Sequence, residues 1–458
     1  MLGKNGWKIT ISRIKKIGFY FGYSMALADH VLAVTPTATP NTLMETPPAR
    51  TTLAIVNSTT PPNLTINELL NGVLTTHPGL KSAQFQARAA LQDVQATERL
   101  RWPTLSVTAE SERQGNNTAF SASRLVRAEQ TLWDFGRIGG KIGEANAAAV
   151  VADTTTDLTK QDLFLQVINA WQQLNGALEK EKVALRALGL LGGYQTQMNR
   201  RVEAKASPQI DLELVNARLL QTEVELTSLR TQIAQTLTRL ELLSGLNNLS
   251  TRLHSVQTTP SMVAIENFAI EIKQTDWNSV ASEHTTVKKA KHDYDILTQR
   301  FESKMAELMP QVYLRVDKPL DTNASINSTK PSYFVGLRFT PAAGFAGQAE
   351  AKAMHTRLRG QVLNIETAER DILQTLLNDR DDFLNARLRH DALSKSVQGS
   401  QVVLDSYLRQ FQAGRKSWQD LLNAARELAQ NEYAQVDALM TISVTMNRLK
   451  LRMELPLD

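Results

Sequence analysis

The histidines are the residues of this sequence best suited to binding a metal or transferring a proton. None lies four residues from another with a glutamate between them, the spacing by which a helix presents two zinc ligands. The chain has no cysteine, which excludes disulfides, thiolate metal sites, a cysteine nucleophile and a lipid-modified N-terminal cysteine. We therefore predict no metal site. The seven histidines are His30, His77, His254, His284, His292, His355 and His390.

Patterns typical of nucleotide binding or nucleophilic catalysis are also missing. There is no phosphate-binding glycine-rich loop and no Gly-x-Ser-x-Gly motif. Gly136, Gly139 and Gly140 follow a predicted strand and open a predicted helix, but their spacing is wrong for a dinucleotide-binding turn. We therefore predict no catalytic residue and no cofactor, and expect that the protein is not an enzyme.

The positive charge of the chain is concentrated at its N-terminus. Its first 28 residues contain five Lys and Arg and no Asp or Glu, and the rest of the chain carries 46 residues of each sign. The formal net charge of +5 thus gives no reason to expect nucleic-acid binding.

The same N-terminal segment has the pattern of a secretory signal peptide. A basic stretch is followed by an apolar run at 17–25 and by Ala26-Leu27-Ala28, a small-x-small cleavage motif. We assign 1–28 to a signal peptide and 29–63, rich in Thr, Pro and Ala, to a flexible lead-in. Elsewhere no uninterrupted apolar run reaches the length of a membrane-spanning helix, so we expect strands to make any membrane contact.

An internal duplication organises the remaining sequence. Residues of like type recur at an offset of 207 and, further along, of 209. The matched pairs are His77/His284, Leu80/Val287, Lys81/Lys288, Ala83/Ala290, Pro103/Pro310, Asp162/Asp371 and Asp211/Asp420. Residues 64–246 and 280–458 are predicted to be two structural repeats joined by an equatorial linker segment, 247–279. His77 and His284 are therefore expected to be structural residues at helix starts.

Each repeat has the same predicted order of elements. A helical stretch (66–100, then 280–308) leads into two short strands, and two long helices follow (138–204 and 208–246, then 346–412 and 417–452). In the last helix of the first repeat, apolar residues recur every seventh position from Leu212 to Leu240. Such heptads predict coiled-coil packing between the long helices.

The predicted strands are amphipathic and too few to close a barrel. They are Thr104–Glu110 and Arg124–Leu132, joined by a loop at Ser111–Thr118, then Gln311–Val316 and Tyr333–Phe339. Apolar residues alternate with polar ones, as in a barrel with lipid outside and water inside. Small barrels need about eight strands, and a bilayer tolerates no open sheet edge. If these strands span a membrane, several chains must share one barrel.

Together these features resemble the TolC family of outer-membrane channels. Two motifs agree: Gln130–Arg137 resembles the strand-to-helix corner of the family, and Tyr407–Leu428 resembles its helix-turn-helix tip. The resemblance implies a mixed α/β membrane protein, a homotrimer whose 12-stranded β-barrel lies in outer-membrane lipid and continues as a long coiled-coil α-helical barrel in the periplasm. It also implies a periplasmic adaptor (membrane fusion protein) and an inner-membrane transporter, of the ABC type, as partners.

The resemblance assigns aperture residues at the helical tips. Asp211 and Asp420 lie where family members place acidic residues lining the aperture, and Asn423 stands where some members have a second acid. Lys416 and Phe411 lie where the family has residues that tie inner to outer helices in the closed state. The alternative is that Asp211 and Asp420 only cap the helices that follow.

Both tips are candidates for contacting the adaptor. In the second tip these are Gly414, Arg415, Ser417 and Trp418, expected to be exposed, with Trp418 as an anchor. In the first tip Lys205 replaces the glycine, so we expect the turn to form at Ser207 and Pro208 instead.

The sequence of the second tip is most similar to family members that serve type I protein secretion. We therefore predict export of protein cargo from an inner-membrane transporter. Multidrug or metal efflux is the alternative, and a periplasmic coiled-coil adaptor is a less favoured one.

Overall fold

The computed structural model describes residues 64–113, 120–255, 261–320, 330–340 and 343–456. The predicted signal peptide, 1–28, and the lead-in, 29–63, lie outside the described residues.

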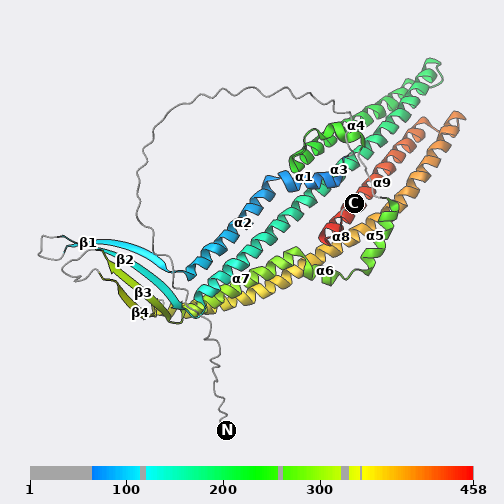
Figure 1. The fold of residues 1–458 in the computed structure, drawn as a ribbon. Helices are drawn as coiled ribbons and strands as arrows, with labels where there is room; N and C mark the ends of the chain where they lie inside the picture. The colour runs from blue at the N-terminus through cyan, green and yellow to red at the C-terminus, as the bar shows by residue number, and fades with distance from the viewer. Residues whose placement is uncertain (1–63, 114–119, 256–260, 321–329, 341–342, 457–458) are drawn as a thin grey trace, which may run out of the picture. The chain divides into compact units, whose positions relative to one another are not determined.

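The described chain is mainly helical, with one small sheet (Figure 1). The helices are α1 (Ile66–Thr76), α2 (Pro78–Glu98), α3 (Arg137–Glu203), α4 (Gln209–Ser244), α5 (Met262–Gln274), α6 (Trp277–Glu283), α7 (Thr285–Glu307), α8 (Ala346–Gln412) and α9 (Trp418–Arg452). The strands are β1 (Thr104–Arg113), β2 (Phe120–Trp133), β3 (Gln311–Pro319) and β4 (Ser332–Arg338). No helix among the described residues combines the length and apolarity needed to cross a membrane.

The first helical stretch of each predicted repeat is interrupted at a histidine, which corrects the expectation of one continuous helix. His77 and His284 are both extended, with ψ of 121° and 143°. The Nδ1 atom of each accepts a hydrogen bond from the backbone N–H two residues later, at 3.2 Å in both cases. Each side chain thus caps the helix that follows, the structural role expected for this pair.

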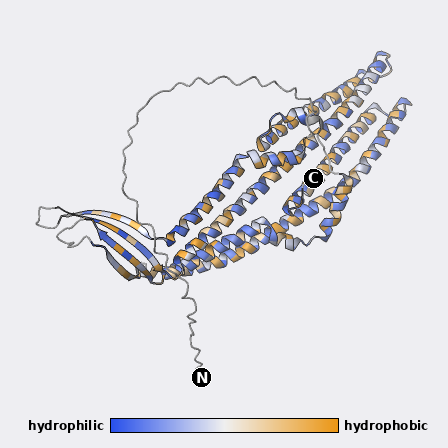
Figure 2. Cartoon of the chain, in the orientation of Figure 1, coloured by the Kyte–Doolittle hydropathy of each residue, from blue (hydrophilic) through white to orange (hydrophobic). Residues whose placement is uncertain are grey.

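The four strands form one antiparallel sheet in the order β1-β2-β3-β4. One face carries exposed apolar residues, among them Leu105, Val107, Val335 and Leu337. Polar and apolar residues alternate along the strands (Figure 2).

The other face of the sheet carries ion pairs between strands, one joining β2 to β3 and one joining β2 to β4 across β3. Arg127 pairs with Asp317 at 2.8 Å, and Arg338 pairs with Glu129 at 2.8 Å. Strand β1 extends to Arg113, into the predicted loop, and β2 begins at Phe120, before its predicted start at Arg124, because their ladder continues to the pair Arg113 and Phe120. A continuous backbone hydrogen-bond ladder here outweighs the polar composition that predicted a loop.

The long helices form two antiparallel hairpins, α3 with α4 and α8 with α9, which lie beside each other (Figure 1). Their bounds agree with the predicted ones to within two residues. Polar and apolar residues mix along them, as expected for helices packed along a seam (Figure 2). Helices α3 and α8 each contain 67 residues.

The two hairpin turns have the same backbone geometry, contrary to the sequence prediction. Lys205 and Gly414 are both left-handed, with φ of 57° and 73°. In each turn a backbone N–H reaches back five residues, from Ala206 to the Arg201 oxygen and from Arg415 to the Gln410 oxygen, at 2.8 Å. The hydrogen bonds that end the helix hold Lys205 in a conformation that glycine adopts more easily.

Candidate functional site: the hairpin tips

An aromatic cluster joins the two hairpin tips. Trp418 is 4% exposed. Its ring lies 5.0 Å from that of Phe411 and 5.7 Å from that of Tyr194, between ring centroids. Tyr194 belongs to α3 and the other two to α8 and α9, so the cluster connects the two repeats. The expectation that Trp418 is exposed is therefore wrong, because the ring packs inward between the hairpins.

The position of Trp418 follows from the start of α9. Ser417 is the N-cap, and its Oγ accepts a hydrogen bond from the Asp420 N–H at 3.1 Å. Trp418 is therefore the first residue of the helix. Its indole N–H donates to the backbone oxygen of Asp211 at 2.9 Å, which fixes the ring to the first tip. One side chain thus supplies both packing and a hydrogen bond between the hairpins.

Phe411 contacts the first repeat through the guanidinium group of Arg201. The guanidinium of Arg201 lies 4.8 Å from the Phe411 ring centroid, within the range of a cation–π contact. Arg201 also donates to the Ser207 hydroxyl at 3.2 Å. The sequence analysis did not identify Arg201 or Tyr194 as functional residues. The one signal in the sequence is that Arg201 departs from the repeat, because the matched residue 209 positions later is Gln410.

Lys416, predicted to tie inner to outer helices in the closed state, makes its contacts within the second hairpin. Its ammonium group lies 4.4 Å from the Tyr407 ring centroid and 3.7 Å from a carboxylate oxygen of Asp420. At the tips it is Arg201, and not Lys416, that contacts the opposite hairpin, because Phe411 faces α3.

Asp420 has the capping role that the sequence left as the alternative. It forms a capping box with Ser417, whose N–H donates to the Asp420 carboxylate at 3.4 Å. These bonds to Ser417 and the charge of Lys416 hold the pKa of Asp420 below its usual value. The carboxylate is therefore ionised at neutral pH, as an aperture ring would require.

Asp211 lies at the equivalent place in α4, but its geometry differs. The N-cap is Pro208, which supplies no side-chain hydrogen bond. The backbone oxygen of Asp211 accepts from Trp418 instead. Asn423 lies exposed one turn beyond Asp420. The aperture role of Asp211, Asp420 and Asn423 stays a prediction.

The other adaptor candidates lie at the surface of the tips. Gly414, Arg415 and Ser417 are exposed in the second turn, and Pro208 is exposed in the first. Ser207 is half-buried and accepts the bond from Arg201. Apart from Trp418, these residues are accessible to a partner.

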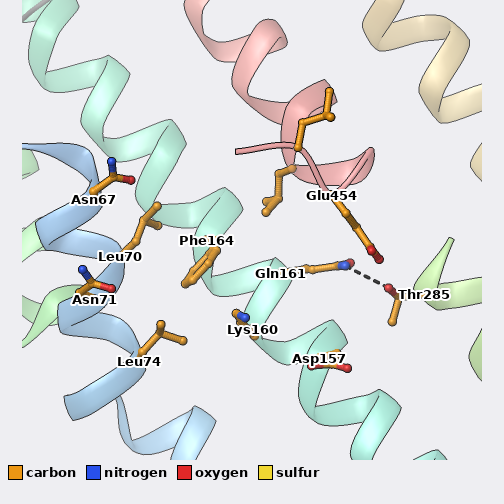
Figure 3. Close-up of a pocket in the computed structure, with 12 residues that line it drawn as sticks. Asn67, Leu70, Asn71, Leu74, Asp157, Lys160, Gln161, Phe164, Thr285 and Glu454 are labelled. Atoms are coloured by element: carbon orange, nitrogen blue, oxygen red, sulfur yellow. Dashed lines mark hydrogen bonds between the residues drawn. The ribbon is translucent and has the colours of Figure 1, made fainter. Parts of the chain in front are cut away.

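A cavity lies away from the tips, between α1, α3, the start of α7 and the end of the described chain (Figure 3). Its volume is about 570 Å³, and its walls mix Leu70 and Phe164 with polar groups. Gln161 donates to the Thr285 hydroxyl across one side at 3.0 Å. No group of three or more metal-ligating side chains occurs among the described residues.

Comparison with known proteins agrees with this architecture. Residues 69–246 match the family model "Outer membrane efflux protein". No curated protein matches the chain.

Solved structures with the same fold cover most of the chain. CusC, described in connection with transmembrane channel formation, has a TM-score of 0.74 at 15% identity, over 85% of this chain and 91% of its own. VceC of Vibrio cholerae has a TM-score of 0.70 at 14% identity, over 85% and 95%. The MtrE outer-membrane channel of Neisseria gonorrhoeae has a TM-score of 0.68 at 16% identity, over 85% and 89%.

The chain has the fold of solved outer-membrane channels such as MtrE. Its residues 69–246 match the outer membrane efflux protein family, and this TolC-like fold is the one that the sequence predicted.

Proposed function

We propose that three copies of this chain form a continuous channel across the outer membrane and the periplasm. The observation that carries the proposal is the four-stranded sheet, in which β1 and β4 are edge strands and one face is apolar and exposed. Such a sheet cannot lie in a bilayer alone, because its edges would leave backbone groups unsatisfied. Pairing β1 of one copy with β4 of the next closes a barrel of about twelve strands.

The helical hairpins continue this barrel, and their tips form its aperture. The tip cluster of Tyr194, Phe411, Trp418 and Arg201 holds the second hairpin against the first within each copy. Opening requires this packing to loosen. A periplasmic adaptor that binds the exposed residues of the turns would supply the energy by favouring the loosened state.

The cargo that we propose is protein, delivered by an ABC-type transporter in type I secretion. Its support is the likeness of the second tip, Ala413–Asn423, to family members with that role. Efflux of small molecules or metal ions is the second candidate, favoured by the family model matched by 69–246.

The shared barrel can be tested by disulfide cross-linking, because the chain has no cysteine of its own. Single cysteines are placed along β1, at Thr104, Ser106 or Thr108, and on β4, at Ser332. A chain with one cysteine in each strand should give a covalent trimer on oxidation in outer-membrane vesicles. Chains with a cysteine in only one of the two strands are the matched controls and should stay monomeric on denaturing gels. A pattern that ends at dimers, or protein found outside the membrane fraction, would overturn the proposal.

The two cargo classes separate in a deletion strain complemented with the chain. Loss of a protein from the culture medium, restored by complementation, supports secretion. Increased sensitivity to toxic small molecules or metal ions with normal protein export supports efflux instead.

A further inference from the structure

A second cavity lies between the two hairpins, next to the tip cluster. Its volume is about 280 Å³, and α3, α4, α8 and α9 all contribute to its walls. The apolar lining includes Leu190, Leu191, Leu404, Leu422 and Leu428. Of these, Leu191, Leu404, Leu422 and Leu428 also belong to the apolar core around Trp418. A molecule in this cavity would therefore touch both hairpins and the packing that joins them.

Three arginines line the cavity, Arg186, Arg218 and Arg426, against two carboxylates, Glu225 and Glu432. Arg186 is paired with Glu432 at 3.0 Å. Arg218 donates to the side-chain oxygen of Gln221 at 3.0 Å and has no carboxylate partner among the described residues. Arg426, which also lines the cavity, makes no hydrogen bond or ion pair with any described residue. Two arginines thus lack an anionic partner.

A buried hydroxyl adds a polar group to the same wall. The Tyr433 hydroxyl is inaccessible and lies beside the carboxylate of Glu225, another residue of the cavity wall. Burial and the nearby carboxylates of Glu225 and Glu432 raise the pKa of Tyr433 to about 12, so the hydroxyl stays neutral and able to donate a hydrogen bond.

We propose that this cavity binds a small amphipathic anion, with an apolar body among the leucines and a carboxylate or sulfonate at Arg218 and Arg426. Ligand sites are typically apolar cavities with a few placed polar groups, and a volume near 300 Å³ suits a ligand of one or two rings. A bound anion connects α4 to α9 and adds contacts that exist only while the hairpins are together. It therefore stabilises the packed tips and lowers the frequency of channel opening. The effect on opening rests on the proposed channel function, whereas binding does not.

The test uses naphthalene-2-sulfonate as the probe and the full-length protein in lipid nanodiscs. Titration calorimetry should show one bound probe per chain. The double variant Arg218→Gln/Arg426→Gln should bind at least tenfold more weakly, and Ala429→Leu, which fills the cavity, should abolish binding. Arg239→Gln is the matched control, because this arginine lies on α4 but does not line the cavity. Thermal melts of all variants check that they remain folded.

Two results would overturn the proposal. The first is equal binding of neutral naphthalene-2-methanol, and the second is binding that Ala429→Leu leaves unchanged; both indicate partition into lipid. Single-channel recording separates this inference from the channel function. Currents without probe binding overturn the site alone, and binding without any current overturns the channel function alone. Binding that leaves the open probability unchanged overturns the proposed effect on opening.

Discussion

The tip cluster depends on the chemistry of single side chains, and Trp418 matters most among them. It contacts aromatic rings from both repeats and donates a hydrogen bond to a backbone oxygen that belongs to the other hairpin. A buried indole combines a large apolar area with one polar group that needs a partner. Both requirements are met here by residues more than two hundred positions apart in the chain.

We predict that Trp418→Ala lowers the free energy of unfolding by about 3–5 kcal/mol, as expected for removing a large buried aromatic ring. Trp418→Phe keeps most of the packing and loses only the hydrogen bond, so its cost should be about 1 kcal/mol. Chemical denaturation monitored by circular dichroism measures both. Gln419→Ala, at the exposed neighbouring position, is the control and should have no effect. An equally small effect of Trp418→Ala would contradict the buried position.

The left-handed turn residues give a second prediction. Gly414→Ala should destabilise the second turn by about 1 kcal/mol, since a Cβ is unfavourable at positive φ. Lys205→Gly should stabilise the first turn by up to about the same amount, because it relieves that cost. Hydrogen exchange of the amides of Ala206 and Arg415 reports each turn separately. If both substitutions shift exchange in the same direction, the two turns do not share the geometry described here.

For single residues, the sequence indicated which side chains matter but not which way they point in the structure. The motif around Phe411 and Trp418 was recognisable, yet the motif does not say which way a ring points. Trp418 was expected at the surface and is buried, since its orientation depends on Tyr194 of the other hairpin. The turn at Lys205 was also mispredicted. A lysine disfavours positive φ, but the hydrogen bonds that end the helix require it at this position.

Among the elements, α9 shows how a local signal sets a helix boundary. Ser417 and Asp420 are three residues apart, the spacing of a capping box, and α9 begins between them. The predicted bounds of the long helices agree with the structure to within two residues. The strands were less predictable at their ends, where pairing with a neighbour extends them beyond their apolar pattern.

The cap should make the first turn of α9 sensitive to acid. The pKa of Asp420 is lower in the folded protein than its usual 3.8, so its contribution to stability is present above that value. It is lost as the pH falls through the folded-state pKa. Amide exchange in the first turn of α9 should therefore accelerate, relative to the intrinsic rate, as the pH drops below about 4.

Asp420→Asn provides the comparison for this measurement. Its first turn should exchange faster than that of the wild type at neutral pH and should not respond further to acid. A wild-type profile that is flat down to pH 3 would show that the carboxylate does not stabilise the helix start.

For the whole molecule, the important relation is between the two hairpins, which a single repeat cannot specify. Arg201 and Phe411 form one contact across this boundary, and Trp418 with Tyr194 forms another. The sequence identified Phe411 and Trp418 but not their partners Arg201 and Tyr194, because the pairing depends on how two independent coiled coils lie against each other. The proposed trimer would add contacts between copies that one chain's sequence cannot specify either.

We predict that loosening this boundary increases channel opening. Phe411→Ala and Arg201→Ala should each raise single-channel open probability in planar bilayers several-fold, and the double variant should add little, because both remove the same contact. Lys416→Ala should have a smaller effect, since its contacts stay within the second hairpin. A larger effect of Lys416→Ala than of Arg201→Ala would contradict the assignment.

The equal lengths of α3 and α8 limit which insertions and deletions this chain can accept during evolution. Both contain 67 residues, about 100 Å of helix, and each ends in a turn that must meet its counterpart. Deleting one residue from one helix would rotate its tip by about 100° and shorten it by about 1.5 Å, which would turn the cluster residues away from one another. A length change that leaves the other hairpin untouched would thus be selected against. The two long helices can therefore lengthen or shorten only together. This explains why the two repeats have kept helices of equal length although their side chains differ.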